Sequence, residues 1–126
     1  MKSIILENSN KKGHYSPGMI SNGMLYISGQ LPFDYEKGKM VEGDITIQLQ
    51  KALSNVGLVL SKAGLIKENV VQCRIYISDI NHWDAVNNGF ATFFGSHKPS
   101  RVIVPSRELH NNALIEIEAI AEMEEE

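Results

Sequence analysis

Two glutamates separated by one residue, Glu116 and Glu118, lie within the apolar stretch LIEIEAIA. Side chains alternate across a β-strand. One face of this strand therefore carries only isoleucine and alanine, while the other carries both glutamates between Leu114 and Ile120. Apolar residues that flank acids on one face indicate a surface that meets another subunit or a ligand rather than bulk water.

Carboxylates on the same strand face can lie close together, and one of them then holds its proton more tightly than an isolated glutamate does. A carboxylate in a partly dry pocket can also position and activate a water molecule. Glu116 is the candidate for that role. The alternative is that each glutamate pairs with an arginine or lysine across an interface, and we favour this interpretation for Glu118.

Arg101 begins the apolar stretch RVIVPS, where a permanent positive charge adjoins a predicted strand. The planar guanidinium donates two parallel hydrogen bonds to a carboxylate, so Arg101 is a candidate for binding an acidic ligand. Two alternatives remain open at this point. Arg101 is either an exposed arginine at a strand end or an ion-pair partner of Glu116 or Glu118.

Two further polar residues, Asn87 and Tyr15, are candidate ligand contacts. Asn87 falls within the aromatic stripe of a predicted helix, and a buried amide must be hydrogen-bonded. Its partner is either a ligand or, more simply, a loop carbonyl. Tyr15 lies in the turn-rich stretch GHYSPG. Most loop tyrosines only pack, but binding groups concentrate on loops held by a rigid scaffold.

Several strands and two helices are predicted to position these groups. The pair Asn22-Gly23 between MIS and MLYIS predicts a hairpin, and SIILEN, residues 3–8, predicts a strand before it. The stretch from Asp44 to Gly64 repeats apolar residues at helical spacing, with the aspartate as N-cap and the glycine as C-terminal stop. VVQCRIYI, residues 70–77, predicts a strand that buries Val71, Cys73, Ile75 and Ile77.

A second helix is predicted after Asp79 or Asn81, either of which could cap it, and before HKPS. Its apolar stripe consists of Trp83, Val86, Phe90, Phe93 and Phe94. RVIVPS and LIEIEAIAEM then give two closing strands. This order predicts one α+β domain over residues 1–126. Two helices cover only one face of such a sheet, so self-association on the other face would place both glutamates near a subunit boundary.

Composition narrows the class of protein. The 126 residues, 43% of them hydrophobic, suffice for a single core. Cys73 is the only cysteine and four histidines are scattered, so we expect no disulfide and no metal site, and a cysteine buried in the core. A net charge of −3 disfavours nucleic acid. The N-terminal stretch lacks the apolar core of a secretory signal and no apolar run is long enough to cross a bilayer, so a cytoplasmic location is expected.

The motifs GHYSPG, LYISGQLP, DAVNNGFATFFGSHKPSR and IEIEAIA, in this order, resemble the YjgF/RidA family of reactive-intermediate deaminases. This resemblance implies a chorismate-mutase-like fold and a homotrimer with ligand sites between adjacent subunits. Active members hydrolyse enamines and imines such as 2-aminoacrylate and 2-aminocrotonate to 2-keto acids and ammonia. They use no metal and no organic cofactor.

The resemblance also implies roles for individual residues. Arg101 matches the arginine that binds the substrate carboxylate, and Glu116 matches the glutamate that holds the attacking water. Positions that line the same cleft correspond to Tyr15, Ser28, Gly29 and Asn87. Active members usually carry serine or threonine and then cysteine after the arginine, whereas this chain has Val102 and Ile103. The family's site uses backbone groups at the second position, so Ile103 is a further candidate contact.

Two other functions follow from the same features. The departure at residues 102 and 103 motivates a non-enzymatic trimer that binds small carboxylates or modulates a partner protein. The family's older labels, endoribonuclease and translation inhibitor, motivate RNA cleavage. The negative charge and the absence of a basic, aromatic-rich stretch argue against RNA as substrate.

Overall fold

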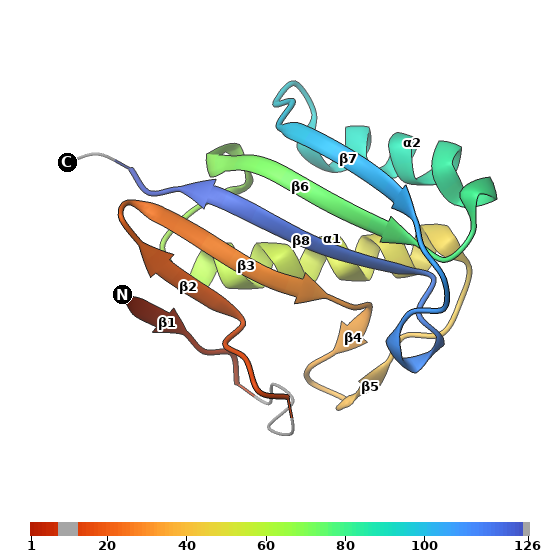
Figure 1. Cartoon of the computed structure of the whole chain (residues 1–126), viewed down its shortest axis with the longest axis horizontal. Coiled ribbons are helices and arrows are strands. Elements are labelled where there is room, and N and C mark those ends of the chain that lie inside the picture. Colours follow the sequence, from red (N-terminus) through yellow and green to blue (C-terminus); the bar gives the residue numbers. More distant parts are fainter. Residues whose placement is uncertain (8–12, 125–126) are drawn as a thin grey trace.

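The sheet and its helical cover are drawn in Figure 1, a view of the computed structural model. The structure describes residues 1–7 and 13–124, and within them six strands form one mixed sheet. The strand order is β1 (Lys2–Ile4), β2 (Gly18–Ser21), β3 (Met24–Gln30), β8 (Ile115–Glu122), β6 (Val70–Ile77) and β7 (Ser100–Pro105). Only the β6–β7 pair is parallel among these neighbours.

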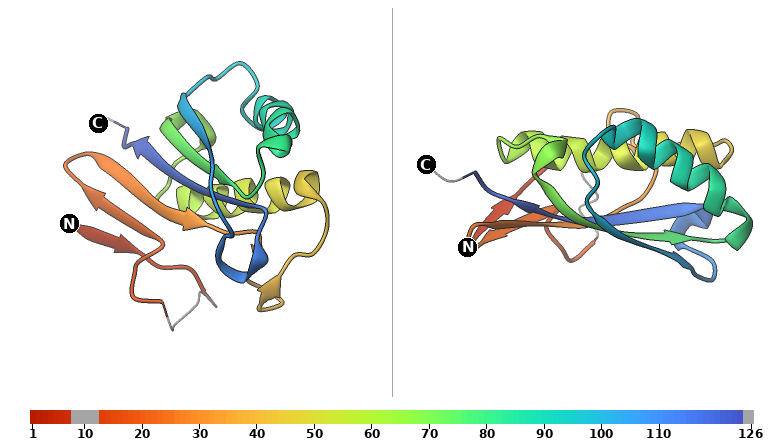
Figure 2. Two further views of the ribbon diagram at one scale, coloured as in Figure 1. Left: turned by 45° about the vertical axis from the view of Figure 1, so that its right-hand side comes forward. Right: turned by 90° about the horizontal axis from the view of Figure 1, so that it is seen from above.

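Both helices, α1 (Ile45–Lys62) and α2 (Trp83–Phe94), pack on the same face of the sheet, as the view from above in Figure 2 shows. The predicted single α+β domain with two helices on one face is therefore confirmed. The helix-covered face holds the core, which includes Leu49, Leu53 and Val56 of α1. We call the opposite, uncovered surface the open face. Neither helix in the described ranges is long and apolar enough to span a bilayer.

Local sequence signals account for the first hairpin and for the ends of α1. Asn22 and Gly23 have φ angles of +51° and +76°, the positive values that a two-residue hairpin turn needs. The side chain of Asp44 accepts a hydrogen bond of 3.0 Å from the backbone N–H of Ile47. Gly64 follows the helix with φ +76°. The predicted turn, N-cap and C-terminal stop are all confirmed.

The start of the second helix differs slightly from the prediction. Asp79 accepts a bond of 2.8 Å from the N–H of Asn81, and this bond caps a 3₁₀ turn, η2 (Ile80–His82), rather than α2 itself. The α-helix then begins at Trp83. Val86, Phe90 and Phe94 are buried as predicted, whereas Trp83 is 38% exposed at the helix start.

Two strand predictions need correction. The first strand ends at Ile4 instead of continuing to residue 8, which lies outside the described residues. Ile4 pairs with Gly18, and the preceding Pro17 has no N–H with which to extend the ladder. Val71 was predicted to be buried, but its side chain is 41% exposed. A register shift between Val70 and Gln72 gives the buried position to Val70 instead.

The central strand β8 alternates as its sequence predicts. Ile115, Ile117, Ala119 and Ala121 are buried against the helices. Glu116, Glu118 and Ile120 are half-buried on the open face. A small hairpin of β4 (Phe33–Asp34) and β5 (Lys39–Met40) follows β3 and was not predicted from the sequence.

Candidate functional site

A hollow of about 560 Å³ lies over the end of β3 on the open face of the sheet. We call it the open-face hollow. Four of the predicted site residues line it, namely Tyr15, Ser28, Gly29 and Glu116. They come from three segments: the stretch before β2, the end of β3 and the middle of β8. The fold therefore gathers these four residues, which are far apart in the sequence, around one cavity.

Ser28 ties the tyrosine-bearing stretch to the sheet. Its hydroxyl donates a bond of 2.6 Å to the carbonyl of Ser16, and its backbone N–H donates one of 2.9 Å to the carbonyl of Pro17. Both bonds fix the backbone directly after Tyr15, whose side chain is 52% exposed beside the hollow. Ser28 itself sits where the pairing register of β3 with β8 shifts.

Gly29 provides the space that the Glu116 carboxylate occupies. A Cβ atom added at Gly29 would lie 2.5 Å from Oε2 of Glu116 and 3.0 Å from its Cδ atom. Real Cβ atoms do not approach another heavy atom this closely, so a side chain here would displace the carboxylate. The absence of a side chain at Gly29 is therefore a condition for the present position of Glu116.

Gly29→Ala is expected to lower the activity of this site about 10- to 100-fold, because a displacement of about 1 Å misaligns a catalytic group. Initial rates of imine hydrolysis, the activity that the family resemblance implies, measure the effect. Gly57→Ala is the matched control, since an added Cβ there meets nothing within 4 Å and helix α1 gains a better helix former. Equal rates in the two variants would show that the contact with Glu116 is irrelevant to the reaction.

The surroundings of Glu116 favour its protonated form. Burial raises the pKa of Glu116, the negative charge of Glu118 raises this pKa further, and His110 acts in the opposite direction. A carboxylate with a raised pKa is a stronger base once ionised. The electrostatics of the hollow thus suit proton abstraction from water.

Glu116→Gln is expected to raise the thermal unfolding midpoint by about 2 °C at pH 7, a small gain because solvent screens this half-buried group. A pKa that is higher in the folded state means that ionisation of Glu116 destabilises the fold as pH rises through that pKa. The difference should vanish below pH 4.5, the ordinary pKa of a glutamate carboxyl. Thermal unfolding from pH 4 to 8 tests this, and a destabilised variant at pH 7 would contradict it.

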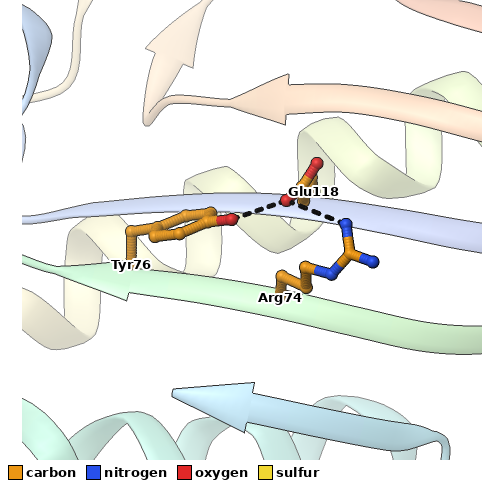
Figure 3. Close-up of polar contacts among 3 residues, drawn as sticks. All are labelled: Arg74, Tyr76 and Glu118. Carbon is orange, nitrogen blue, oxygen red and sulfur yellow. Dashed lines mark hydrogen bonds and ion pairs between the residues drawn. The ribbon is translucent and has the colours of Figure 1, made fainter. Parts of the chain in front are cut away.

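Glu118 pairs with an arginine, as predicted, but the arginine belongs to its own chain. The Tyr76 hydroxyl donates a bond of 2.6 Å to Oε1 of Glu118, and Nη1 of Arg74 lies 3.5 Å from the same oxygen. Figure 3 shows both partners on β6, reaching the glutamate from its two sides. The prediction of a partner across an interface is therefore not needed to explain Glu118.

Arg101 lies on the other face of the sheet from Glu116. It is in register with the buried Cys73 of β6 and, through that residue, with Ala119 of β8, and all three share the helix-covered face. Glu116 belongs to the open face of β8. The sheet therefore separates Arg101 from the open-face hollow within one chain, which rules out its pairing with Glu116 or Glu118 of the same chain.

Helix α2 holds the guanidinium of Arg101 in place. Nη1 donates a bond of 2.9 Å to Oδ1 of Asn87, and the Cζ atom lies 5.1 Å from the ring centroid of Phe90 and 5.7 Å from that of Trp83. The sequence left a loop carbonyl or a ligand as the partner of Asn87, and the structure adds a third partner, because Oδ1 of Asn87 accepts from Arg101. These residues border a second hollow, of about 360 Å³, lined in part by Asn87, Phe90 and Arg101.

The backbone of Ile103 is placed to face outward from the sheet edge. The N–H of Ser106 donates to the carbonyl of Ile77 on β6. Since the pointing direction of backbone groups alternates along a strand, Ile103 and Pro105 direct theirs away from β6. Pro105 has no N–H to contribute, which agrees with this outward position. The Ile103 side chain packs against the core.

Two titratable residues that line the open-face hollow, Tyr35 and His110, were not predicted from the sequence. The Tyr35 hydroxyl donates a bond of 2.9 Å to Oε1 of Gln30, and burial raises the tyrosine pKa to about 12. Asn55 of α1 fixes the same segment by donating to the carbonyls of Leu31 and Phe33. The turn signal DYEKG around residue 36 could have predicted the hairpin that carries Tyr35.

Two further predictions concern the single cysteine and a metal site. Cys73 is fully buried in the core, as predicted, and burial raises the pKa of its thiol to about 12. Across residues 1–7 and 13–124, no group of three or more histidine, cysteine, aspartate or glutamate side chains is arranged to hold a metal ion.

Comparison with known proteins identifies the family. The sequence model described as Endoribonuclease L-PSP matches residues 7–123. The chain is 39% identical over 123 residues to a RutC family protein of Pyrococcus horikoshii, which covers 96% of this chain and 98% of that protein. It is also 37% identical over 109 residues to the 2-iminobutanoate/2-iminopropanoate deaminase of Capra hircus, covering 86% of this chain and 80% of that one.

A solved structure agrees with this result. The crystal structure of E. coli TdcF with bound serine matches with a TM-score of 0.91 at 28% identity, covering 98% of this chain and 100% of that one. The chain therefore belongs to the endoribonuclease L-PSP family, also known as the YjgF/RidA family. The resemblance noted in the sequence is confirmed at the level of family and fold.

Proposed function

We propose that the protein is a hydrolytic deaminase of short 2-imino acids, which converts substrates such as 2-aminoacrylate and 2-aminocrotonate to 2-keto acids and ammonia. The active unit is a homotrimer with its sites between neighbouring protomers. One protomer contributes Arg101, Asn87 and the backbone of Ile103. The next contributes Glu116 and the other residues of the open-face hollow.

The observation that carries this proposal is the placement of Arg101 and Glu116 on opposite faces of the sheet. Arg101 lies at the edge strand β7, and Glu116 lies on an open face that also carries the half-buried Ile120 and the 47% exposed Tyr26. Packing of the edge of one protomer on the open face of the next would bury this apolar surface and bring the two groups together. The similarity to a mammalian imine deaminase supports the choice of substrate.

The residues present can perform the hydrolysis. Arg101, oriented by Asn87, binds the substrate carboxylate through two charge-assisted hydrogen bonds and so fixes the position of C2. Glu116 holds a water molecule against C2 and takes one of its protons as the carbon–oxygen bond forms. The proton taken up by Glu116 passes to the nitrogen, which gives the tetrahedral carbinolamine. Transfer of the carbinolamine's hydroxyl proton to nitrogen then breaks the carbon–nitrogen bond, releasing ammonia and leaving the 2-keto acid. An imine is reactive in water already, so positioning and modest base catalysis suffice.

A coupled assay tests the proposal. Threonine dehydratase generates 2-aminocrotonate and its imine in situ, and keto-acid and ammonia release are followed from the earliest times against a blank without the protein. The wild type should accelerate release, and Glu116→Gln should reduce the rate to that of the blank. Wild-type rates equal to the blank, with a dehydratase of verified activity, would refute the deaminase.

A carboxylate-binding module without catalysis is the second candidate, favoured by Val102 and Ile103 in place of the polar pair expected after Arg101. The crystal structure of E. coli TdcF holds bound serine, so a protein of similar fold binds an amino acid. Calorimetry with 2-ketobutanoate distinguishes the two functions, because binding without imine turnover supports the module. RNA cleavage has less support, since the chain carries a net charge of −3.

A further inference from the structure

A polar cluster on the open face adjoins Glu116 and has no part in the hydrolysis described above. It consists of Glu118, Tyr76 and Arg74, which are connected by the 2.6 Å hydrogen bond and the 3.5 Å ion pair (Figure 3). Glu118 lines the open-face hollow together with Glu116. The cluster therefore keeps a second carboxylate at the edge of the candidate site.

The Tyr76 hydroxyl does not bond to the residue directly opposite it on the neighbouring strand. Tyr76 is the direct cross-strand partner of Glu116, and Arg74 is the partner of Glu118. The Tyr76 hydroxyl nevertheless reaches diagonally to Glu118. A carboxylate that accepts a strong hydrogen bond becomes a weaker base. Because the Tyr76 hydroxyl donates its hydrogen bond to Glu118, it does not donate one to Glu116.

We propose that Glu118, held by Tyr76 and Arg74, is a positioning residue that maintains a fixed negative charge beside Glu116 and thereby makes Glu116 a stronger base. This inference rests on the proposed function, in which Glu116 takes a proton from water. Tyr76 and Arg74 act through Glu118: the first keeps its carboxylate in one orientation, and the second places a compensating positive charge 3.5 Å from it.

The other titratable groups around Glu116 set the background for this effect. His110 approaches from the turn η3 (His110–Asn112), and its charge opposes that of Glu118. Tyr15 and Tyr35 line the hollow from the segments before β2 and after β4. Burial of Glu116 adds to the effect of Glu118. In the proposed trimer, Arg101 of the neighbouring protomer also faces Glu116. None of these groups changes when Glu118 or Arg74 is replaced, so their contribution cancels in a comparison of variants.

Replacement of Glu118 and replacement of Arg74 should have opposite effects on the pKa of Glu116. Glu118→Gln removes the negative charge that raises the pKa of Glu116, so this pKa should fall. The acid limb of the kcat/KM profile then moves to lower pH, and kcat falls about two- to fivefold with little change in KM. Arg74→Gln leaves Glu118 uncompensated and should move the same limb to higher pH.

Glu122→Gln is the matched control, since Glu122 ends the same strand on the same face as Glu116 and Glu118. Six residues of strand, about 20 Å, separate it from Glu116, which exceeds the screening length of about 8 Å at physiological salt. This variant loses the same charge and should leave the acid limb in place. Thermal unfolding of each variant verifies that it remains folded.

The test is read in two ways that separate this inference from the proposed function. Carboxyl ¹³C NMR follows the titration of Glu116 in the protein without substrate, and imine kinetics follow the acid limb. If Glu118→Gln shifts the NMR titration no more than Glu122→Gln does, or if Arg74→Gln shifts it in the same direction as Glu118→Gln, the inference is overturned. If the NMR shifts appear as expected but wild type hydrolyses no imine, the charge coupling stands and the deaminase fails.

Discussion

Replacement of Arg101 by alanine is expected to lower kcat/KM for imine hydrolysis about 100-fold or more. Each charge-assisted hydrogen bond to a carboxylate is worth roughly 1.5–3 kcal/mol, and the variant loses both together with the orientation of C2. Arg101→Lys retains the charge but not the planar fork, so it should recover only part of the activity. The coupled dehydratase assay measures all three proteins.

Arg107→Ala is the matched control for this prediction. Arg107 is an exposed arginine that follows the same strand β7. Its loss changes the net charge equally but leaves the bond between Arg101 and Asn87 in place. The control should keep the wild-type rate. An unchanged rate in Arg101→Ala, with the oligomer intact, would remove Arg101 from the site.

The elements of this fold that could be predicted from sequence are those determined by local chemistry. The Asn22-Gly23 hairpin and the Asp44 cap depend on residues within a single turn, and the structure has both. Val71 was misassigned because a register shift depends on how β6 pairs with β8, which alternation within one strand does not reveal. The end of β1 likewise depends on Pro17, a residue next to the partner strand.

Among the candidate site residues, too, some could be predicted from local sequence and others depend on how the strands pair. Glu116 could be selected from its own strand, because a carboxylate in an apolar alternation is unusual whatever surrounds it. The face that Arg101 occupies could not, since it depends on the parallel register of β7 with β6. Ser28 and Gly29 were identified only through family resemblance. The structure adds the physical reason for Gly29, which is the carboxylate that occupies the place of its missing side chain.

Mixing two inactive variants is expected to restore activity, because Arg101 and Glu116 of one site come from different protomers. In a trimer, each interface joins the Arg101 side of one chain to the open face of the next. If Arg101→Ala and Glu116→Gln chains assemble at random in equal amounts, about one site in four pairs a native arginine with a native glutamate. The mixture should therefore recover about a quarter of the wild-type rate, whereas each variant alone should stay near the blank.

The recovery is measured after joint unfolding and refolding of the two variants, with each variant refolded alone as the control. Native mass spectrometry of the same samples must detect mixed trimers. A site contained within one chain would gain nothing from mixing, since every chain in the mixture carries one of the two lesions. Mixed trimers without activity, or a wild type that remains monomeric at assay concentrations, would therefore exclude the inter-subunit site. Either result would also exclude a joint role of Arg101 and Glu116, because the sheet of a single chain keeps them on opposite faces.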